Sequence, residues 1–203
     1  ASPYVLDRVQ NDDYFDWIGA VFKNSTQQNH AVSVTGNSNN TSYALSLGYS
    51  LDQGSFEGDK MNRYNIRTQF NSKIKDIATI GGQINMSFTD RDAGADNLVR
   101  DALLMNPMMH AYDENGNLVN QPGVPSALRI PPGGNSMTSK FNPLVDIKNT
   151  INNSRTYYVL TSIYGELTPL NGFSLKTQFS PKLRMARQGE YYGLYIDRRF
   201  QDG

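Results

Sequence analysis

Apolar and polar residues alternate strictly between Ser42 and Phe70, and this alternation is the clearest pattern in the chain. Apolar side chains occupy every second position from Tyr43 to Tyr49 and again from Tyr64 to Phe70, where Thr68 is the one exception, and a glycine-rich turn separates the two runs. A period of two predicts extended strands with one apolar face and one polar face. Because charged and amide groups line the polar faces and aromatics frame the apolar faces, the pattern is typical of transmembrane barrel strands.

Four further segments extend the predicted sheet with the same alternation, at 31–36, 80–89, 156–167 and 173–180. Tight polar turns are predicted at 36–42, 71–76 and 168–172, and longer connections at 51–62 and 90–155. One end of the sheet is therefore expected to carry short turns and the other long loops, as in bacterial outer-membrane barrels. Pro181 is expected either to end the last strand or to mark a bulge.

A soluble β-sandwich is the alternative fold, because its strands also alternate. The spacing of the aromatic residues favours a barrel instead. Aromatics lie six residues apart on the apolar face in the pairs Tyr43 and Tyr49, Tyr64 and Phe70, and Phe173 and Phe179. Six residues of strand span about 20 Å, close to the height of a lipid-facing band flanked by aromatic residues.

The region 90–155 interrupts the strand pattern. Within it, Leu98, Ala102 and Met105 share one side of a predicted short helix that Asn106 and Pro107 end. The rest is rich in proline and glycine and is predicted to be a long loop, a feature that usually has a function. Residues 1–29 are predicted to be loop with at most one helical turn.

Composition excludes several classes of protein. Nineteen basic and nineteen acidic side chains balance, so no nucleic-acid partner is indicated. Cysteine is absent, which excludes disulfides, thiolate metal sites and cysteine nucleophiles. No apolar stretch of about 18 residues could form a transmembrane helix, whereas barrel strands need only about ten residues each, half of them polar. The first residues lack the charged and apolar regions of a signal peptide.

The sequence offers little for catalysis or metal binding. Asp113–Asn117 resembles a calcium loop in composition, but its glycine stands fourth rather than sixth, so a type I′ turn at Asn115-Gly116 is the favoured interpretation. His30 and His110 lack metal-ligand spacing, and no nucleophile, phosphate-loop or dinucleotide motif occurs. We therefore expect no enzymatic activity, no catalytic residues, no metal and no cofactor. The aromatic side chains of Trp17, Tyr112 and the Tyr191-Tyr192 pair suit either sugar stacking or local packing.

Several short motifs in order resemble the SusC/RagA-type TonB-linked outer-membrane transporters of Bacteroidetes. They are Asp16-Trp17, Gln28-Asn29-His30, Val32-Ser33-Val34 with Gly36, Tyr43, Ser46-Leu47-Gly48-Tyr49, Gly54, Arg63-Tyr64, Ile66-Arg67, Tyr112–Gly116, Asn142-Pro143-Leu144 and Gly172-Phe173. The resemblance runs through most of the chain and weakens beyond Gln188. The chain departs from the family at Gly36-Asn37, where a double glycine is common, and at Gln69, where asparagine is common.

The resemblance implies an all-β fold: an antiparallel meander forming part of a large transmembrane β-barrel, with one long extracellular loop containing a short helix. By this comparison the chain is a fragment covering roughly the second to seventh strands. Its expected parts are an extracellular loop (1–29), strands (30–89), the long extracellular loop (90–155), strands (156–190) and a final loop (191–203). The implied partners are outer-membrane lipid, a SusD-like lipoprotein, the remainder of the barrel, and the TonB complex through regions absent here.

The implied function is TonB-dependent import of an oligosaccharide or peptide nutrient across the cell outer membrane, and the alternative is a soluble carbohydrate-binding or adhesive β-domain. The residues expected to face lipid are Leu45, Leu47, Ile66, Ile84, Val159, Ile163 and Leu175. Those expected to face the lumen are Arg67, Gln83, Asn85, Tyr164, Glu166 and Lys176. Those expected to contact substrate or the lipoprotein lid are Trp17, His110, Tyr112, Asp113, Asn115 and Arg129.

Overall fold

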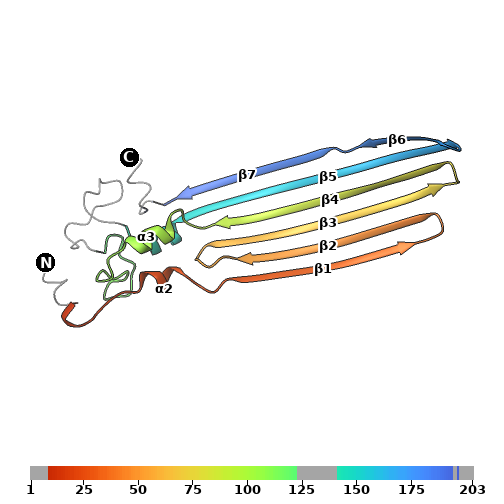
Figure 1. Ribbon diagram of the computed structural model, residues 1–203. Coiled ribbons are helices and arrows are strands. Elements are labelled where there is room, and N and C mark those ends of the chain that lie inside the picture. Colours follow the sequence, from red (N-terminus) through yellow and green to blue (C-terminus); the bar gives the residue numbers. More distant parts are fainter. Residues whose placement is uncertain (1–8, 123–140, 194–195, 197–203) are drawn as a thin grey trace.

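A computed structural model describes residues 9–122, 141–193 and 196. Figure 1 shows one long antiparallel sheet with short helices gathered at one of its ends. The strands are β1 Thr26–Asn37, β2 Thr41–Gln53, β3 Asp59–Ile74, β4 Ala78–Ala93, β5 Thr150–Leu170, β6 Phe173–Phe179 and β7 Lys182–Tyr192. The helices are α2 Trp17–Val21, α3 Leu98–Leu104 and α4 Pro143–Asn149. We call the end that carries the helices the loop end, and the opposite end the turn end.

The strands pair with their neighbours in chain order, as a meander from β1 to β6, and β7 also pairs with β5. Strands β6 and β7 lie in line along the same edge of β5. Ile163 faces Phe179 and Leu160 faces Lys182, so three residues separate these pairs on both strands and the register does not change. Strand β6 ends at Phe179, just before Pro181, as the first of the two sequence expectations states, and β7 resumes the pairing with β5 at Lys182 without a bulge.

Several strands extend further toward the loop end than their apolar patterns predict. Strand β5 begins at Thr150 rather than 156, and β1 begins at Thr26. The connection between β2 and β3 shrinks to residues 54–58, so the long loop predicted at 51–62 is mostly strand. The alternation fails as a guide there because both faces of these strand ends carry polar side chains.

Helices α2 and α3 correspond to predicted helical segments, whereas α4 was not predicted. In α3, the predicted inward side is buried, with Leu98, Ala102 and Met105 between 2% and 7% exposed. The helical turn expected within residues 1–29 is α2. Helix α4 was not predicted; Asn142 caps it by accepting a hydrogen bond from the Leu144 amide, and Pro143 occupies its first turn.

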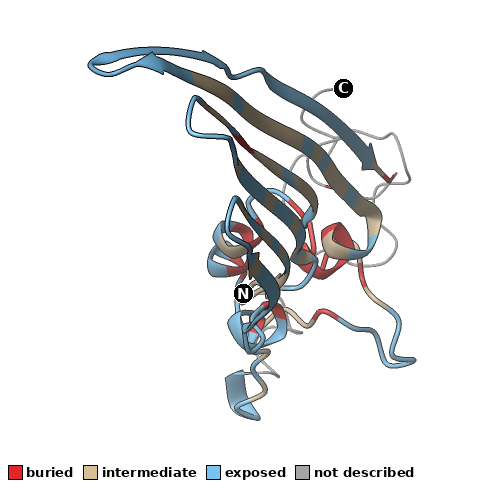
Figure 2. Ribbon diagram, turned by 90° about the vertical axis from the view of Figure 1, so that its right-hand side faces the viewer, coloured by how far each residue is buried: buried red, intermediate tan, exposed pale blue. Residues whose placement is uncertain are grey.

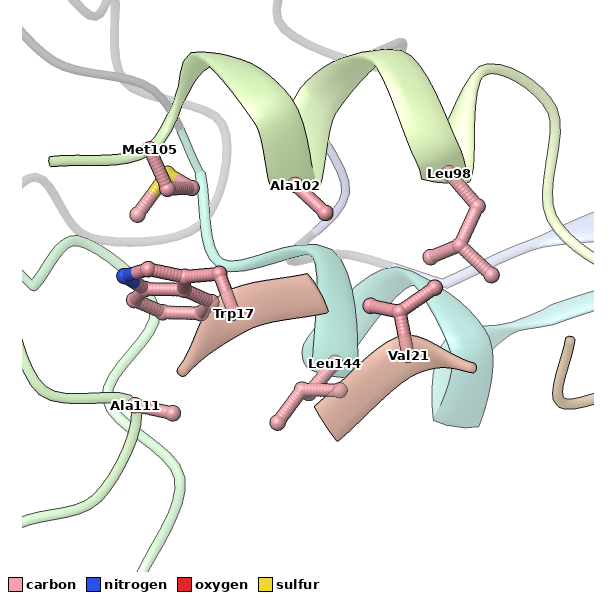
Figure 3. Packing of buried hydrophobic residues seen from close by; sticks show 7 residues of the cluster. All are labelled: Trp17, Val21, Leu98, Ala102, Met105, Ala111 and Leu144. Atoms are coloured by element: carbon pink, nitrogen blue, oxygen red, sulfur yellow. The ribbon is translucent and has the colours of Figure 1, made fainter. Parts of the chain in front are cut away.

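The hydrophobic core lies beyond the strand ends and not on the sheet. Figure 3 shows its side chains converging from α2, α3, α4 and the following segments: Trp17, Val21, Leu98, Ala102, Met105, Ala111 and Leu144. In Figure 2 the buried residues gather at this end, while the strands are largely exposed or intermediate. Among the described residues a single sheet is present, so the face-to-face packing of a β-sandwich does not occur in this part of the chain.

The described helices are short, and none of them combines the length and the apolar character needed to cross a membrane.

Candidate functional site

The two faces of the sheet separate apolar from polar side chains as the alternation predicts. Residues directly opposite in neighbouring strands share a face, and Leu47 faces Ile66 while Ile66 faces Met86. All seven residues predicted to face lipid lie on this one side, which we call the apolar face. The six predicted lumen residues lie on the other side, the polar face, where Arg67 pairs with Asn85 and Glu166 with Lys176.

The apolar face is the more open of the two. On β2, Tyr43, Leu45 and Leu47 are exposed, whereas the intervening small residues of the polar face are half-buried. Val32 on the neighbouring strand is 69% exposed. Such an area of unburied aliphatic side chain on one face is unusual for a water-soluble domain and marks a surface that contacts lipid or another protein.

A continuous row of rings crosses five strands on the apolar face. His30, Tyr49, Tyr64, Phe88 and Tyr157 are directly opposite one another in successive strands. Neighbouring ring centroids are 6.3, 5.1, 6.1 and 4.7 Å apart along the row. We call this the loop-side aromatic row, and distances of this size allow favourable ring–ring contacts on a sheet surface.

A second, sparser row lies six residues closer to the turn end. Tyr43 faces Phe70, and Phe179 lies in the same row on β6 opposite Ile163. The ring of Tyr43 lies over Gly36 and that of Phe70 lies against Gly82, so glycines stand where the rings need room. Phe173 lies outside both rows, nearer the turn end, so the predicted pair Phe173 and Phe179 does not frame the same band as the other pairs.

The apolar face shifts along the strands from one side of the sheet to the other. On β1 and β2 it ends near Gly36 and Tyr43, whereas on β4 to β6 exposed apolar residues continue to Ile80, Leu167 and Leu175. A level band must shift in this way when strands are inclined to it, as the strands of transmembrane barrels are, by about 35–45°.

Beyond the loop-side aromatic row, the same face becomes polar. The hydroxyl of Tyr49 donates a hydrogen bond to Oδ1 of Asn62 at 3.1 Å, pointing outward along the strand. The amide of Asn153 donates to Oδ1 of Asp90 and Oδ1 of Asp92, both at 2.8 Å. Ring bodies against an apolar band with polar tips toward charged groups are typical of the boundary between hydrocarbon and water.

The polar face carries hydrogen-bonding groups and two cations over aromatic rings. The ammonium groups of Lys176 and Lys182 lie 4.7 and 5.4 Å from the ring centroids of Tyr164 and Tyr158. Leu160 is an apolar exception on this face, since it lies opposite Asn85. We refer to Ser162, Gln178 and Ser180 as the hydroxyl cluster, because their side chains are joined by hydrogen bonds of 2.9–3.1 Å.

At the loop end, a buried asparagine joins the elements around the core. Asn142 is fully buried, and its amide donates to the carbonyls of Ala111 and Val119, both at 2.9 Å. Its Oδ1 accepts from the Leu144 amide, so one side chain ties α4 to both ends of the hairpin 111–119. That hairpin closes through the Val119 amide, which donates to the Ala111 carbonyl.

Two predicted contact residues meet on one side of Phe15. The Phe15 ring lies 5.8 Å from His110 and 6.2 Å from Tyr112. Tyr112 is 46% exposed, while Nε2 of His110 is 3.1 Å from Oδ1 of Asp13 in a geometry that does not make a hydrogen bond. Phe15 was not predicted, because a single aromatic in an acidic stretch gives no periodic signal.

Asp113 and Asn115 lie in the turn of the hairpin. Oδ1 of Asp113 accepts hydrogen bonds from the amides of Asn115 and Asn117, at 2.9 and 2.8 Å. At this turn only Gly116 has a positive φ, of 79°, so the turn is not the predicted type I′, which requires positive φ at both central residues. Asp113 therefore holds the turn, and Asn115 is exposed at its tip.

The two remaining predicted contact residues, Trp17 and Arg129, add nothing to the surface that the structure describes here. Trp17 is 3% exposed in the core and donates through Nε1 to the Asn106 carbonyl at 3.2 Å, so it has no surface for a ligand. Arg129 lies outside the described residues. No group of three or more metal-ligating side chains occurs in the part of the chain that the structure describes.

Comparison with known proteins agrees with the geometry of the sheet. No family model matches the chain. TonB-dependent receptor P26 of Formosa agariphila is 24% identical over 178 residues, which are 87% of this chain and 17% of that protein. A structure of the RagAB peptide transporter matches with a TM-score of 0.71 and 21% identity, covering 92% of this chain and 21% of the matched chain.

Two further structures of the same system match similarly. The RagAB peptide importer in the closed-closed state gives a TM-score of 0.70 at 22% identity, covering 91% of this chain and 21% of the matched chain. The open-open state gives 0.68 at 23% identity, covering 87% and 19%. The chain thus has the fold of a section of these proteins and spans about a fifth of their length.

Proposed function

We propose that this chain forms part of the wall of a TonB-dependent outer-membrane barrel that imports a nutrient, with the apolar face toward lipid and the polar face toward the lumen. The observation that carries the proposal is the division of one sheet into an exposed apolar face, framed by two aromatic rows, and a polar face. A surface of this composition is stable in hydrocarbon only as part of a closed barrel, because open strand edges leave backbone groups unpaired.

The proposed nutrient is a peptide, with an oligosaccharide as the alternative. The similarity to chains of a peptide importer supports a peptide. The polar face also suits a peptide, since it offers amide, hydroxyl and charged groups that hydrogen-bond main-chain groups. No chemistry among the described residues calls for an enzymatic role.

The loop end is the proposed contact surface for the substrate or for a SusD-like lipoprotein. Exposed Tyr112 and half-buried His110 lie beside Phe15, and the core beneath holds their backbone in place. An aromatic side chain held on a rigid support loses little entropy on binding, which suits it to recognition. Asn115 lies at the tip of the same hairpin and could donate or accept hydrogen bonds.

Nutrient uptake by the whole transporter tests the proposal. Cells lacking the transporter should lose growth on a defined peptide mixture as nitrogen source, and restoring the whole protein should recover it. Growth on free amino acids is the control, because it bypasses the transporter. Recovery of the protein in a water-soluble fraction without detergent, or unchanged growth of the deletion strain on both peptides and oligosaccharides, would refute the proposal.

A further inference from the structure

Two arginines lie directly opposite each other on the apolar side of the sheet. Arg155 on β5 faces Arg187 on β7, one residue pair beyond Tyr157 and Met185 on the same face. The Arg155 side chain is 51% exposed, and Arg187 is exposed as well. Like charges directly opposite in antiparallel strands destabilise a sheet, so this pairing requires a compensating group.

The described protein residues supply only part of that compensation. Oδ1 of Asp90 is 3.5 Å from Nε of Arg155, and among the described residues no group pairs with the two terminal nitrogens of that guanidinium group. Asp90 and Asp92 share the amide of Asn153 on the opposite side of β5 from β7. Among the described residues, no carboxylate forms an ion pair with Arg187.

The position of the pair relative to the aromatic row indicates what surrounds it. Two residues along a strand span about 7 Å, so both arginines lie just outside the loop-side aromatic row that ends at Tyr157. In a membrane, aromatic residues of this kind lie at headgroup level, where lipid phosphates are found. The next pair outward, Asn153 and Gly189, leaves space, because a Cβ at Gly189 would have no neighbour within 4 Å.

We propose that Arg155 and Arg187 together bind a phosphate group of an anionic lipid in the outer leaflet. The inference rests on the proposed membrane orientation of the sheet. Guanidinium groups bind phosphate oxygens through paired N–H donors, and two of them on adjacent strands surround one phosphate from two sides. The bound anion removes the repulsion between the arginines, and Asp90 orients the Arg155 side chain through Nε.

Binding of a phosphorylated lipid to the whole detergent-purified transporter tests the site. The variants are Arg155→Gln, Arg187→Gln and the double variant, with Arg184→Gln as the matched control, because Arg184 is an exposed arginine of the same strand on the polar face. The probe is lipid A carrying its phosphates, quantified by native mass spectrometry. Each single variant should weaken binding about fivefold, the effect expected of one cation near a charged membrane surface, and the double variant more than tenfold. Arg184→Gln should bind like the unmodified protein.

Two ligand controls test whether the site recognises the phosphate group of a lipid. Dephosphorylated lipid A should bind the unmodified protein as weakly as phosphorylated lipid A binds the double variant. Inorganic phosphate at millimolar concentration should not displace the lipid, because it lacks the acyl chains that contact the adjacent apolar face. Unchanged binding by the double variant, equal binding of the dephosphorylated lipid, or full displacement by inorganic phosphate would each overturn the proposal.

Barrel assembly and peptide uptake are measured on the same variants. If the unmodified protein assembles and transports but the arginine variants bind lipid normally, the lipid site is wrong and the proposed transport function stands. If the unmodified protein needs no detergent and does not transport, the proposed function itself fails.

Discussion

The ring of Phe70 lies against Gly82 on the neighbouring strand, so that a Cβ at position 82 would come within 3.1 Å of Phe70 Cε1 and 2.9 Å of the Ser162 carbonyl oxygen. Backbone lies on one side of the glycine and a packed ring on the other. The Ser162 carbonyl belongs to the backbone of β5 and cannot move without disturbing the pairing of β4 and β5, whereas the Phe70 ring, which is 41% exposed, must turn aside. Gly82 is thus required by its neighbours and not by its own backbone conformation.

Gly82→Ala should therefore destabilise the barrel by about 1–3 kcal/mol, the usual cost of forcing an extra methyl group into a packed site. Gly165→Ala is the matched control, since Gly165 is on the same face and a Cβ there would meet nothing within 4 Å. The measurement is the midpoint temperature of unfolding in detergent. Equal midpoints for the two variants would show that the Phe70 ring and the β5 backbone accommodate the added methyl group without loss of stability.

A charge on the apolar face should disrupt assembly, whereas a charge on the polar face should not. Leu47→Arg puts a cation between the two aromatic rows, two residues from Tyr49 and four from Tyr43, where it should cost about 2–4 kcal/mol in lipid. Gln83→Arg puts the same side chain on the polar face. The fraction of folded protein, read as heat-modifiable migration on a gel, should fall only for Leu47→Arg. Similar folded fractions would contradict the proposed orientation.

Removing the Asn142 side chain should loosen the loop end without unfolding the sheet. Asn142→Ala leaves the buried carbonyl of Val119 without this donor, takes one of two donors from the Ala111 carbonyl and removes the cap of α4, for an expected loss of about 2–4 kcal/mol. Limited proteolysis should then cleave between 98 and 149 faster, while heat-modifiability persists. Asn115→Ala, at an exposed turn position, should leave the cleavage rate unchanged, and equally fast cleavage of both variants would argue against a special role for Asn142.

The exposed ring of Tyr112 should matter for binding, and its hydroxyl less so. Tyr112→Ala should weaken peptide or lipoprotein binding by about tenfold, as is common for an exposed aromatic at an interface. Tyr112→Phe keeps the ring and should retain most of the affinity. Isothermal titration of the whole transporter with its lipoprotein and with peptide measures both. If Tyr112→Ala binds both normally, the contact surface lies elsewhere.

The sheet could be predicted from sequence because its strands are amphipathic with a period of two. Leu45, Leu47 and Ile66 alternate with polar or small residues between the two aromatic rows. The face on which each side chain lies, and the pairing of successive strands, could therefore be predicted. The strand ends could not be predicted in this way. Near Asn153 and Arg155 the apolar face becomes charged, the alternation disappears, and the first residues of β5 resemble a loop.

The loop end was harder to predict because its order depends on contacts between distant residues. Trp17 was expected at a contact surface but packs against residues from α3 and α4, far along the chain. Asn142 is part of the Asn142-Pro143-Leu144 motif, but nothing in that motif indicates that its side chain joins α4 to both ends of the hairpin 111–119. Helix α4 has only 7 residues, too few to show a helical period. The Asn142-Pro143 cap is therefore the only sequence feature that indicates it.

Pro181 leaves one backbone hydrogen bond of the sheet unformed. Its carbonyl accepts from the Thr161 amide at 3.1 Å, but proline has no N–H to return to the Thr161 carbonyl opposite. The missing bond lies between the two aromatic rows, where, in the proposed orientation, hydrocarbon offers no substitute. The hydroxyl cluster adjoins this gap on the polar face, so the carbonyl can be hydrated from the lumen. In the proposed orientation, the one backbone carbonyl that Pro181 leaves without its ladder partner is therefore served by groups on the lumen side, and the lipid side of the sheet supplies none.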